Sequence, residues 1–186
     1  MVGEEFTPGE ITLRPAVLAD ADVIANLHVR VWRETYRDLA SPGAYAALTE
    51  GVRAQRWRAT LADSASQQIT LVAEEGGRLL GFGTACAPTE TLFGDRGEIR
   101  WLHVAPEAAR RGIGRRLMRA LTETLRGWGY RGCALAVVLG NQPAIAFYER
   151  LGGRQAGVFV DPGPLWRSKN IVFVWDDFGD LVGERA

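Results

Sequence analysis

The sequence predicts a single α/β domain, and three observations support this prediction. The 186 residues suit one domain with a substantial core. Short apolar runs typical of strands alternate with longer segments whose apolar residues recur at helical spacing. No internal repeat, linker or low-complexity segment divides the chain. We expect a domain at residues 10–178, between a flexible N-terminal tail at 1–9 and a C-terminal tail at 179–186.

The first half of the chain predicts a strand, two helical regions and a hairpin. Ile11–Arg14 alternates in polarity like a short strand. Asp20 has the residue type of a helix N-cap, and apolar residues recur at helical spacing after it until Ser41–Gly43. A second helical region is expected from about 44 to 61. Two strand-like runs around a glycine turn then predict a hairpin, followed by a polar loop. The two runs and the loop are residues 69–73, 78–85 and 88–97.

The second half predicts strands that alternate with helices. Residues 98–104 have the composition of a central strand, and a helix is expected from about Gly112 to Arg126. The apolar residues of this helix repeat every fourth position and share one buried face: Ile113, Leu117, Leu121 and Leu125. Gly127 and Gly129 end it. The remaining elements are a strand at 133–139, a helix from near Pro143 to Gly152, and strands at 155–160 and 170–175.

The turn before the long helix has the features of an anion site. Gly112 and Gly114 let the backbone approach a ligand, and free N–H groups at a helix start attract phosphate. Five arginines cluster there, which favours an anion site over a solvated helix face: Arg110, Arg111, Arg115, Arg116 and Arg119. A mononucleotide P-loop would need Lys and Ser or Thr after Gly114, and a dinucleotide fingerprint would need glycine at Leu117. Neither nucleotide pattern fits.

Two segments resemble the GNAT N-acetyltransferase superfamily. Ala109–Gly114 resembles its acyl-CoA turn, Gln/Arg-x-x-Gly-x-Gly/Ala, with a departure at the first position. Asn141–Gly152 resembles its Asn-x-x-Ala-x-x-x-Tyr-x-x-x-Gly helix, and a looser resemblance extends from Ile11 to about Trp175. The resemblance implies a mixed, mostly antiparallel, twisted sheet flanked by helices and splayed between the fourth and fifth strands. It also implies acetyl-CoA as acyl donor and direct transfer to a primary amine of a small molecule or peptide.

The resemblance implies which residues bind the donor. Main-chain groups of Leu102, His103 and Val104 are expected to pair with the pantetheine arm. The phosphate turn is expected to bind pyrophosphate through Ala109, Arg110, Arg111, Gly112, Ile113, Gly114 and Arg115. For Asn141 two interpretations stay open, a hydrogen bond to pantetheine or a helix cap.

Tyr148 and Glu98 are the candidate catalytic residues. Tyr148 occupies the tyrosine position of the superfamily, also borders the donor, and would protonate the departing thiolate; the alternative is a core tyrosine. Glu98 would accept the amine proton through water, or it is a solvated carboxylate at a strand end. His103 is a rival base whose strand position suggests burial. Enzymes that resemble ribosomal-protein alanine acetyltransferases carry glutamate at the position of Ala136, which argues against that acceptor.

The acceptor site is the least specified part of the sequence. His28, Trp32 and Tyr36 form one stripe at four-residue spacing, which suits either an acceptor pocket or core packing. The loops 88–97 and 161–169 are expected to shape that pocket. Gly153 stands where the superfamily often has an aromatic residue.

Composition narrows the remaining functions. Zero net charge does not indicate binding to nucleic acid or membrane, and no apolar run is long enough for a membrane span. No spacing of paired metal ligands is present, and Cys86 and Cys133 are expected as buried, unactivated thiols. The acidic N-terminus lacks a signal-peptide core, so we expect a cytoplasmic protein.

The superfamily also allows a homodimer paired through edge strands. Two alternatives to the acetyltransferase stay open: a non-catalytic CoA-binding regulatory module, and an acyltransferase for longer acyl chains.

Overall fold

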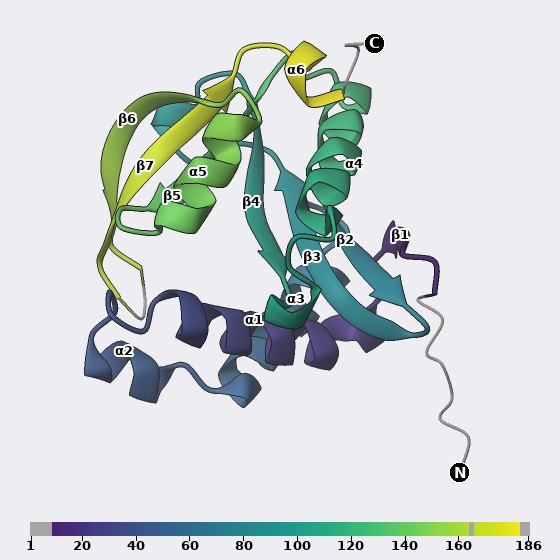
Figure 1. Ribbon diagram of the computed structural model, residues 1–186, viewed down its shortest axis with the longest axis vertical. Helices are drawn as coiled ribbons and strands as arrows, with labels where there is room; N and C mark the ends of the chain where they lie inside the picture. The colour runs from purple at the N-terminus through teal and green to yellow at the C-terminus, as the bar shows by residue number, and fades with distance from the viewer. Residues whose placement is uncertain (1–8, 164–165, 183–186) are drawn as a thin grey trace.

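Seven strands form one twisted sheet in the structure, a computed structural model that describes residues 9–163 and 166–182. The strand order across the sheet is β1-β2-β3-β4-β5-β7-β6 (Figure 1). The strands are β1 Thr12–Pro15, β2 Gln68–Glu75, β3 Arg78–Cys86, β4 Gly97–Val104, β5 Cys133–Val138, β6 Arg154–Asp161 and β7 Ser168–Trp175. The helices are α1 Ala21–Thr35, α2 Pro42–Ala47, α3 Glu50–Ala62, α4 Ile113–Gly127, α5 Gln142–Arg150 and α6 Gly179–Val182.

The pairing of β4 with β5 differs from every other pairing in the sheet. These two strands run parallel, while all other neighbours are antiparallel. They pair only at Gly97 with Cys133 and at Glu98 with Ala134. Beyond these two pairs the strands separate, and the sheet is splayed between its fourth and fifth strands. The predicted fold class, including the splay, is therefore confirmed.

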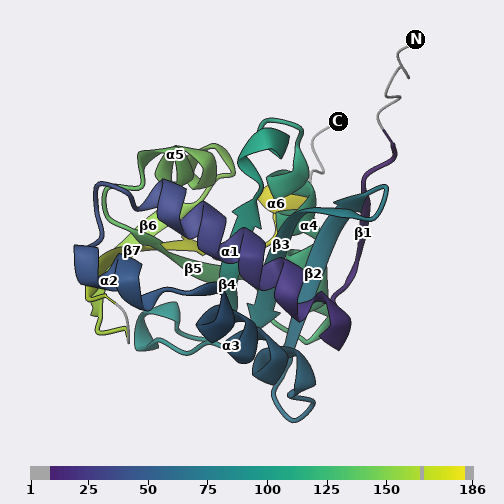
Figure 2. The same ribbon diagram turned by 90° about the horizontal axis from the view of Figure 1, so that it is seen from below.

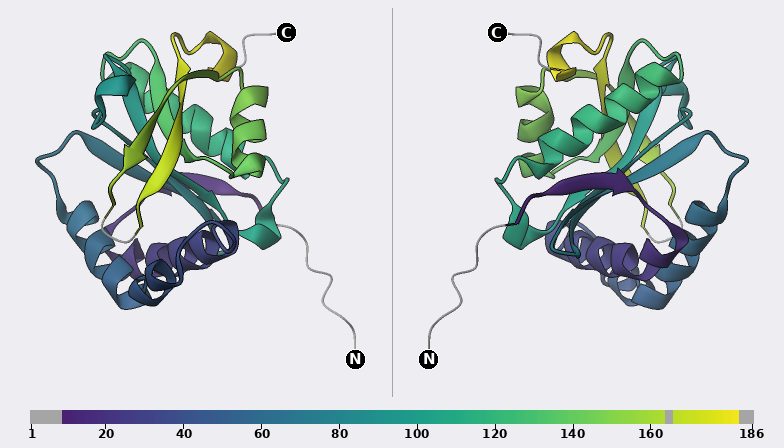
Figure 3. Two further views of the ribbon diagram at one scale, coloured as in Figure 1. Left: turned by 90° about the vertical axis from the view of Figure 1, so that its left-hand side faces the viewer. Right: turned by 90° about the vertical axis from the view of Figure 1, so that its right-hand side faces the viewer.

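Helices cover both faces of the sheet. Helices α1 and α3 pack on each other, and α1 also packs on β3 and β4 (Figure 2). Helix α4 packs against β2, β3 and β4 from the opposite side, as the two views of Figure 3 show. Helix α5 lies on the same side as α4, across the separated ends of β4 and β5. This arrangement leaves the splay bordered by α1 below and by α4 and α5 above.

The central helix α4 has the predicted amphipathic pattern. Its four apolar residues at four-residue spacing are buried against the sheet. The helix can lie this close because the facing strand position is Gly97. A Cβ atom there would lie 2.5 Å from Leu125 Cδ2, which is nearer than real Cβ contacts allow. The glycine at position 97 therefore allows α4 to pack directly on β4.

Gly153, which had no explanation in the sequence, lies under the ring of Trp175. A Cβ atom on Gly153 would lie 2.6 Å from Trp175 Cζ2 and 2.9 Å from the Tyr148 carbonyl oxygen. The Trp175 indole Nε1 donates a hydrogen bond to the Leu151 carbonyl at 2.8 Å. The aromatic ring that packs here therefore comes from β7, and any larger residue at position 153 would collide with it.

Three details of the expected elements need correction. Asp20 does not cap α1, because its carboxylate accepts hydrogen bonds from the Arg14 guanidinium and the Val17 N–H instead. The helical region at 44–61 is two helices, since Thr49 interrupts it and accepts a hydrogen bond from the Val52 N–H. The folded part extends beyond residue 178, because α6 packs on α4 and buries Leu181. Of the expected N-terminal tail, residues 1–8 lie outside the described part of the chain.

Candidate active site

The splay between β4 and β5 opens into a cavity of about 560 Å³, which we call the donor cavity. Its walls come from β4, the turn after it, the start of α4, β5, α5 and the end of α1. On the side facing β5, the main chain of Leu102, His103 and Val104 has no strand partner. These backbone groups are therefore free to pair with an extended ligand, as the resemblance implied.

The turn that closes one end of the donor cavity is shaped to bind an anion. Arg110 and Gly112 adopt left-handed backbone angles, with φ of 62° and 77°. In turns where right-handed and left-handed residues follow one another, the N–H groups can point toward a common point, which suits an anion. Gly112 is the N-cap of α4 and offers no side chain to its first N–H groups, so these remain available. A left-handed arginine is uncommon, and such backbone conformations cluster at turns and functional sites.

The structure separates the arginines of this region into two groups. Arg110 and Arg115 line the donor cavity. The other three are engaged elsewhere: Arg111 with Glu75, Arg116 with the Ile11 carbonyl, and Arg119 with Glu123. Of the predicted donor residues, only the Arg111 side chain is directed away from the cavity; its partner Glu75 lies 2.6 Å away on β2.

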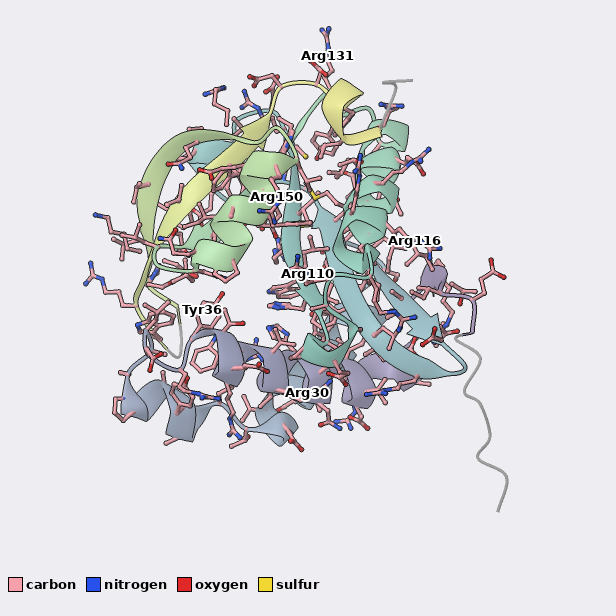
Figure 4. The ribbon with its side chains drawn as sticks, viewed as in Figure 1. Arg30, Tyr36, Arg110, Arg116, Arg131 and Arg150 are labelled. Carbon is pink, nitrogen blue, oxygen red and sulfur yellow. The ribbon has the colours of Figure 1, made fainter. Side chains whose placement is uncertain are left out.

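Arg150 is a donor-cavity residue that the sequence analysis missed. It lies at the end of α5, and its side chain faces the gap between α5 and α4, as Arg110 does from the turn (Figure 4). In the sequence, only its position two residues after Tyr148 on a short helix pointed to Arg150. That position alone does not show on which side of the helix its side chain lies.

Tyr148 lies inside the donor cavity with its ring packed in the core. The residue is 7% exposed, and its ring contacts Phe147, Phe173 and Trp175. Burial raises the pKa of Tyr148, and the neighbouring Tyr36 raises it further. The phenol therefore holds its proton at neutral pH, which an acid catalyst requires.

Asn141 and Tyr36 lie together at the junction of α5 and α1. The Asn141 side chain accepts a hydrogen bond from the Ala144 N–H at 3.3 Å, so it caps α5. It also lines the donor cavity, so both interpretations of this residue are compatible with the structure. Burial raises the pKa of Tyr36, and the Asn141 side chain offsets part of the rise. Figure 4 shows Tyr36 at the end of α1, directed into the space below α5.

A second cavity of about 420 Å³, the acceptor cavity, lies on the other side of the splay. It receives His28, Trp32 and Tyr36 from α1, as the stripe on this helix predicted as one alternative. The two cavities have five lining residues in common: Tyr36, Arg100, Trp101, His103 and Ala136. The two cavities are therefore neighbours at the place where β4 and β5 separate.

Comparison with known proteins identifies the family. A family model described as the acetyltransferase (GNAT) family matches residues 31–153. The chain belongs to the GNAT acetyltransferase family. As a member, the protein is an acyltransferase.

Sequence relatives of this acetyltransferase are bacterial. One, described as the uncharacterized N-acetyltransferase YuaI of Bacillus subtilis (strain 168), is 27% identical over 139 residues, covering 75% of this chain and 78% of YuaI. The mycothiol acetyltransferase of Clavibacter sepedonicus is 30% identical over 159 residues, covering 86% of this chain. This chain spans about half of that relative, 48% of its length.

Solved structures share the fold at low sequence identity. The PaiA N-acetyltransferase from Thermoplasma acidophilum, in complex with coenzyme A, aligns with a TM-score of 0.67 at 18% identity, over 87% of this chain and 98% of that chain. The yncA structure from Salmonella typhimurium, with its cofactor acetyl-CoA, aligns with a TM-score of 0.65 at 18% identity, over 95% and 96% of the two chains.

Glu98 of this acetyltransferase is buried at the acceptor cavity and is held by two neighbours. Only 4% of the residue is exposed. Its Oε2 accepts hydrogen bonds from the Thr89 N–H at 2.9 Å and the Thr89 hydroxyl at 2.7 Å. Its Oε1 accepts from Arg100 Nε at 3.1 Å. The carboxylate is therefore fixed in place by these hydrogen bonds. A solvated carboxylate at a strand end, the alternative in the sequence analysis, does not describe this residue.

Two neutral histidines face each other between α1 and β4. Burial and the charge of Arg53 lower the pKa of His103 to about 4. Burial, His103 and Arg53 lower the pKa of His28 well below its ordinary value. Their ring centres are 4.7 Å apart, and Trp57 Nε1 donates to His28 Nδ1 at 3.2 Å, which assigns the proton of His28 to Nε2. A base with a pKa near 4 has little driving force to accept a proton at pH 7, which weakens His103 as the catalytic base.

The two cysteines are buried and free, as predicted. Burial and the nearby Glu98 raise the pKa of Cys86 to about 12. Burial also raises the pKa of Cys133. Neither thiol is activated as a nucleophile, as the sequence analysis expected.

Across residues 9–163 and 166–182, no group of three or more His, Cys, Asp or Glu side chains is placed to hold a metal ion. Within the same residues, no helix combines the length and apolar composition needed to cross a membrane.

Proposed function

We propose that the protein transfers the acetyl group of acetyl-CoA directly to the primary amine of a small molecule or peptide. The observation that carries this proposal is the meeting of two cavities at the splay, one with free main chain and an anion-binding turn, the other with a buried carboxylate. The thioester supplies an electrophilic carbonyl when the donor is bound. The fit of the donor cavity rests on the left-handed turn at Arg110 and Gly112 and on the arginines at its mouth.

Three groups of residues hold and orient the donor in this proposal. The main chain of Leu102, His103 and Val104 binds the extended arm by strand-like pairing. The N–H groups from Arg110 to Gly114 bind pyrophosphate, and the side chains of Arg110, Arg115 and Arg150 add positive charge. The Val104 or Leu102 N–H is also placed to stabilise the oxyanion, an interaction whose loss typically costs about 10²–10³ in rate.

Glu98 and Tyr148 divide the proton transfers. Glu98 accepts a proton from the acceptor ammonium through water on the acceptor side. The free amine nitrogen then forms a bond to the acetyl carbon while the carbon–sulfur bond breaks, and the new amide nitrogen loses its extra proton to water, which later returns a proton to Tyr148. Tyr148 gives its proton to the departing sulfur on the donor side. No covalent acetyl-enzyme is needed, in agreement with the protonated cysteines.

Turnover of acetyl-CoA across a panel of amines tests the proposal. The panel contains a polyamine, single amino acids, an aminoglycoside and a peptide with a free N-terminus, and release of the CoA thiol is followed. We expect acceptor-dependent release that depends on both substrates. Release no faster than spontaneous hydrolysis with every acceptor, despite CoA binding, would show a non-catalytic CoA-binding module.

A further inference from the structure

The acceptor cavity contains an arginine that no other side chain neutralises. Arg53 lies on α3 and lines this cavity, and its Nε atom is buried without a hydrogen-bond partner. Among the ion pairs of residues 9–163 and 166–182, neither Arg53 nor Arg56 takes part. Arg56 lines the same cavity three residues later, on the same face of α3. A partly buried positive charge without an ion-pair partner is stabilised when an anion binds beside it.

The charge of Arg53 acts on its surroundings in the cavity. Burial and the proximity of Arg56 lower the pKa of Arg53 to about 10. Arg53 in turn lowers the pKa of both His28 and His103, which line the same cavity. The two histidine rings are 4.7 Å apart, and His103 also lines the donor cavity.

The acidic side chains of the cavity do not neutralise Arg53. Glu98 is paired with Arg100 at 3.1 Å and bonded to Thr89. Glu90 lines the cavity from an exposed loop position and Asp161 from the exposed end of β6, where Asp161 accepts a hydrogen bond from the Gly163 N–H at 2.8 Å. The remaining walls are largely aromatic, from Trp32, Phe93, Trp101, Phe159 and Trp166.

We infer that the acceptor is a small amine that also carries an oxyanion, a carboxylate or a phosphate, which Arg53 binds with help from Arg56. This inference rests on the proposed function, because it names the acceptor class of the same site. Arginine matches both anions through paired N–H donors, and such charge-assisted hydrogen bonds are stronger than neutral ones. A volume of about 420 Å³ falls in the range of small-molecule sites, and the aromatic walls suit an apolar amino-acid side chain.

Matched acceptor pairs test the inference by turnover. Leucine, methionine and phenylalanine are each compared with their carboxamides, and phosphoethanolamine is compared with ethanolamine. Rates are compared at equal concentrations of unprotonated amine, because a carboxamide lowers the pKa of its amine. We expect kcat/KM to be at least about 10-fold higher for the anionic member, either in the amino-acid pairs or in the phosphoethanolamine pair. The kind of pair that shows this difference identifies the anion as a carboxylate or a phosphate. Equal kcat/KM within every pair would overturn the inference.

Variants of α3 assign the preference to Arg53. Arg53→Gln is expected to reduce the preference for the anionic acceptor about 10- to 100-fold, mainly through KM, while turnover of the neutral partner changes little. Arg53→Lys keeps the charge and restores part of the preference. Arg58→Gln is the matched control, since Arg58 lies on the same helix but pairs with Asp22 outside the cavity. A merely structural role of Arg53 would lower the rates of both members of a pair equally, together with the melting temperature.

Product binding separates failure of this inference from failure of the proposed function. N-acetylphenylalanine and its carboxamide are titrated calorimetrically into the protein in the presence of CoA, which requires no turnover. Tighter binding of the acid that is lost in Arg53→Gln supports the anion site even if no acceptor is acetylated. Two results together would overturn the anion site: turnover of amines with no preference for the anionic acceptors, and equal binding of both acetylated products. The acetyltransferase function would still stand.

Discussion

The donor cavity and the acceptor cavity meet at one splay but are built in different ways. The donor cavity is formed largely by one continuous segment, from Leu102 to Arg115, with α5 opposite it. Its key groups are backbone N–H groups whose direction depends on a few glycines and a helix start. The acceptor cavity takes side chains from α1, α3, the loop before β4, β4, β5 and the last two strands. A site made of backbone in one segment leaves a readable motif, whereas a site made of side chains from distant segments does not.

The electrostatics of the two cavities differ as well. Arg110 and Arg115 at the donor cavity are exposed and keep their charge in contact with water. At the acceptor cavity, Glu98 is buried and Arg53 is buried in part, and His28 and His103 are neutral. Substitution of charged residues at the donor cavity should therefore change the Kd of acetyl-CoA modestly. Substitution of charged residues at the acceptor cavity should change the acceptor preference and the stability of the fold more strongly.

The largest effect is expected from removing the Tyr148 hydroxyl of the donor cavity. Tyr148→Phe should lower kcat by about 10²–10⁴, because the departing thiolate loses its proton donor. The Kd of acetyl-CoA should change less than about two-fold, because the ring remains and only the hydroxyl is lost. Pre-steady-state turnover and calorimetry measure the two quantities. Tyr36→Phe removes the same atom from the neighbouring ring and is the matched control. A greater loss in Tyr36→Phe than in Tyr148→Phe would transfer the acid role to Tyr36.

The buried histidines of the acceptor side should make folding sensitive to mild acid. Both histidines have a lower pKa in the folded protein than the value of about 6.5 expected when unfolded. The unfolded chain therefore binds more protons as the pH falls below 6.5, and the free energy of unfolding decreases. For His103, with a folded pKa of about 4, the loss is about 2 kcal/mol at pH 5.

Urea unfolding at pH 7, 6 and 5 measures this loss, and His103→Gln should remove the share of that residue. Carboxylates with lowered pKa, such as Glu75 and Asp176, lose their contribution only below the usual carboxyl pKa of about 4. They therefore do not account for changes between pH 7 and 5. Equal stability at pH 7 and pH 5 would show that the histidines are not buried as neutral rings.

A smaller effect is expected from the exposed charges of the donor side. The double variant Arg110→Gln, Arg115→Gln should raise the Kd of acetyl-CoA about 10-fold at low salt, because two cations at the phosphate turn are lost. The difference should shrink at high salt, since exposed charges are screened. Calorimetry at two ionic strengths measures it. An unchanged Kd would mean that the backbone N–H groups of the turn bind the phosphates without help from these two side chains.

The smallest effect is expected from Arg111→Gln. The Arg111 side chain pairs with Glu75 and is directed away from the donor cavity, so the Kd of acetyl-CoA should change less than about two-fold. Loss of this ion pair should lower the stability only slightly, because an ion pair in contact with water contributes little. A loss of CoA affinity as large as in the double variant would mean that Arg111 turns toward the ligand when it binds.

The sequence specified the fold more fully than the site. Strong periodicity placed α4 and its buried face within one residue, and the turn from Ala109 to Gly114 was recognisable because its residues are contiguous. Asp20 occupies the predicted N-cap position of α1, but it makes no capping hydrogen bond because the nearby Arg14 binds its carboxylate. The partner of Arg111 lies 36 residues away on β2, and this separation hides the ion pair from local patterns.

The acceptor cavity was even harder to predict from the sequence, because its residues come from segments that are far apart in the chain. The stripe of His28, Trp32 and Tyr36 was visible, but helical spacing does not distinguish a cavity wall from core packing. Arg53 and Arg56 appeared as ordinary charges on a helix, because only the packing of α3 against α1 brings them to the cavity. Gly153 could be explained only once Trp175 of β7 was placed over it.

Calorimetric titration with acetyl-CoA, with desulfo-CoA and ATP as controls, tests most directly whether the splay and its turn form a CoA site. The account predicts roughly micromolar binding of both CoA forms and no comparable binding of ATP, because the pantetheine arm as well as the phosphates must be held. Absence of CoA binding, or equal binding of ATP, would contradict it.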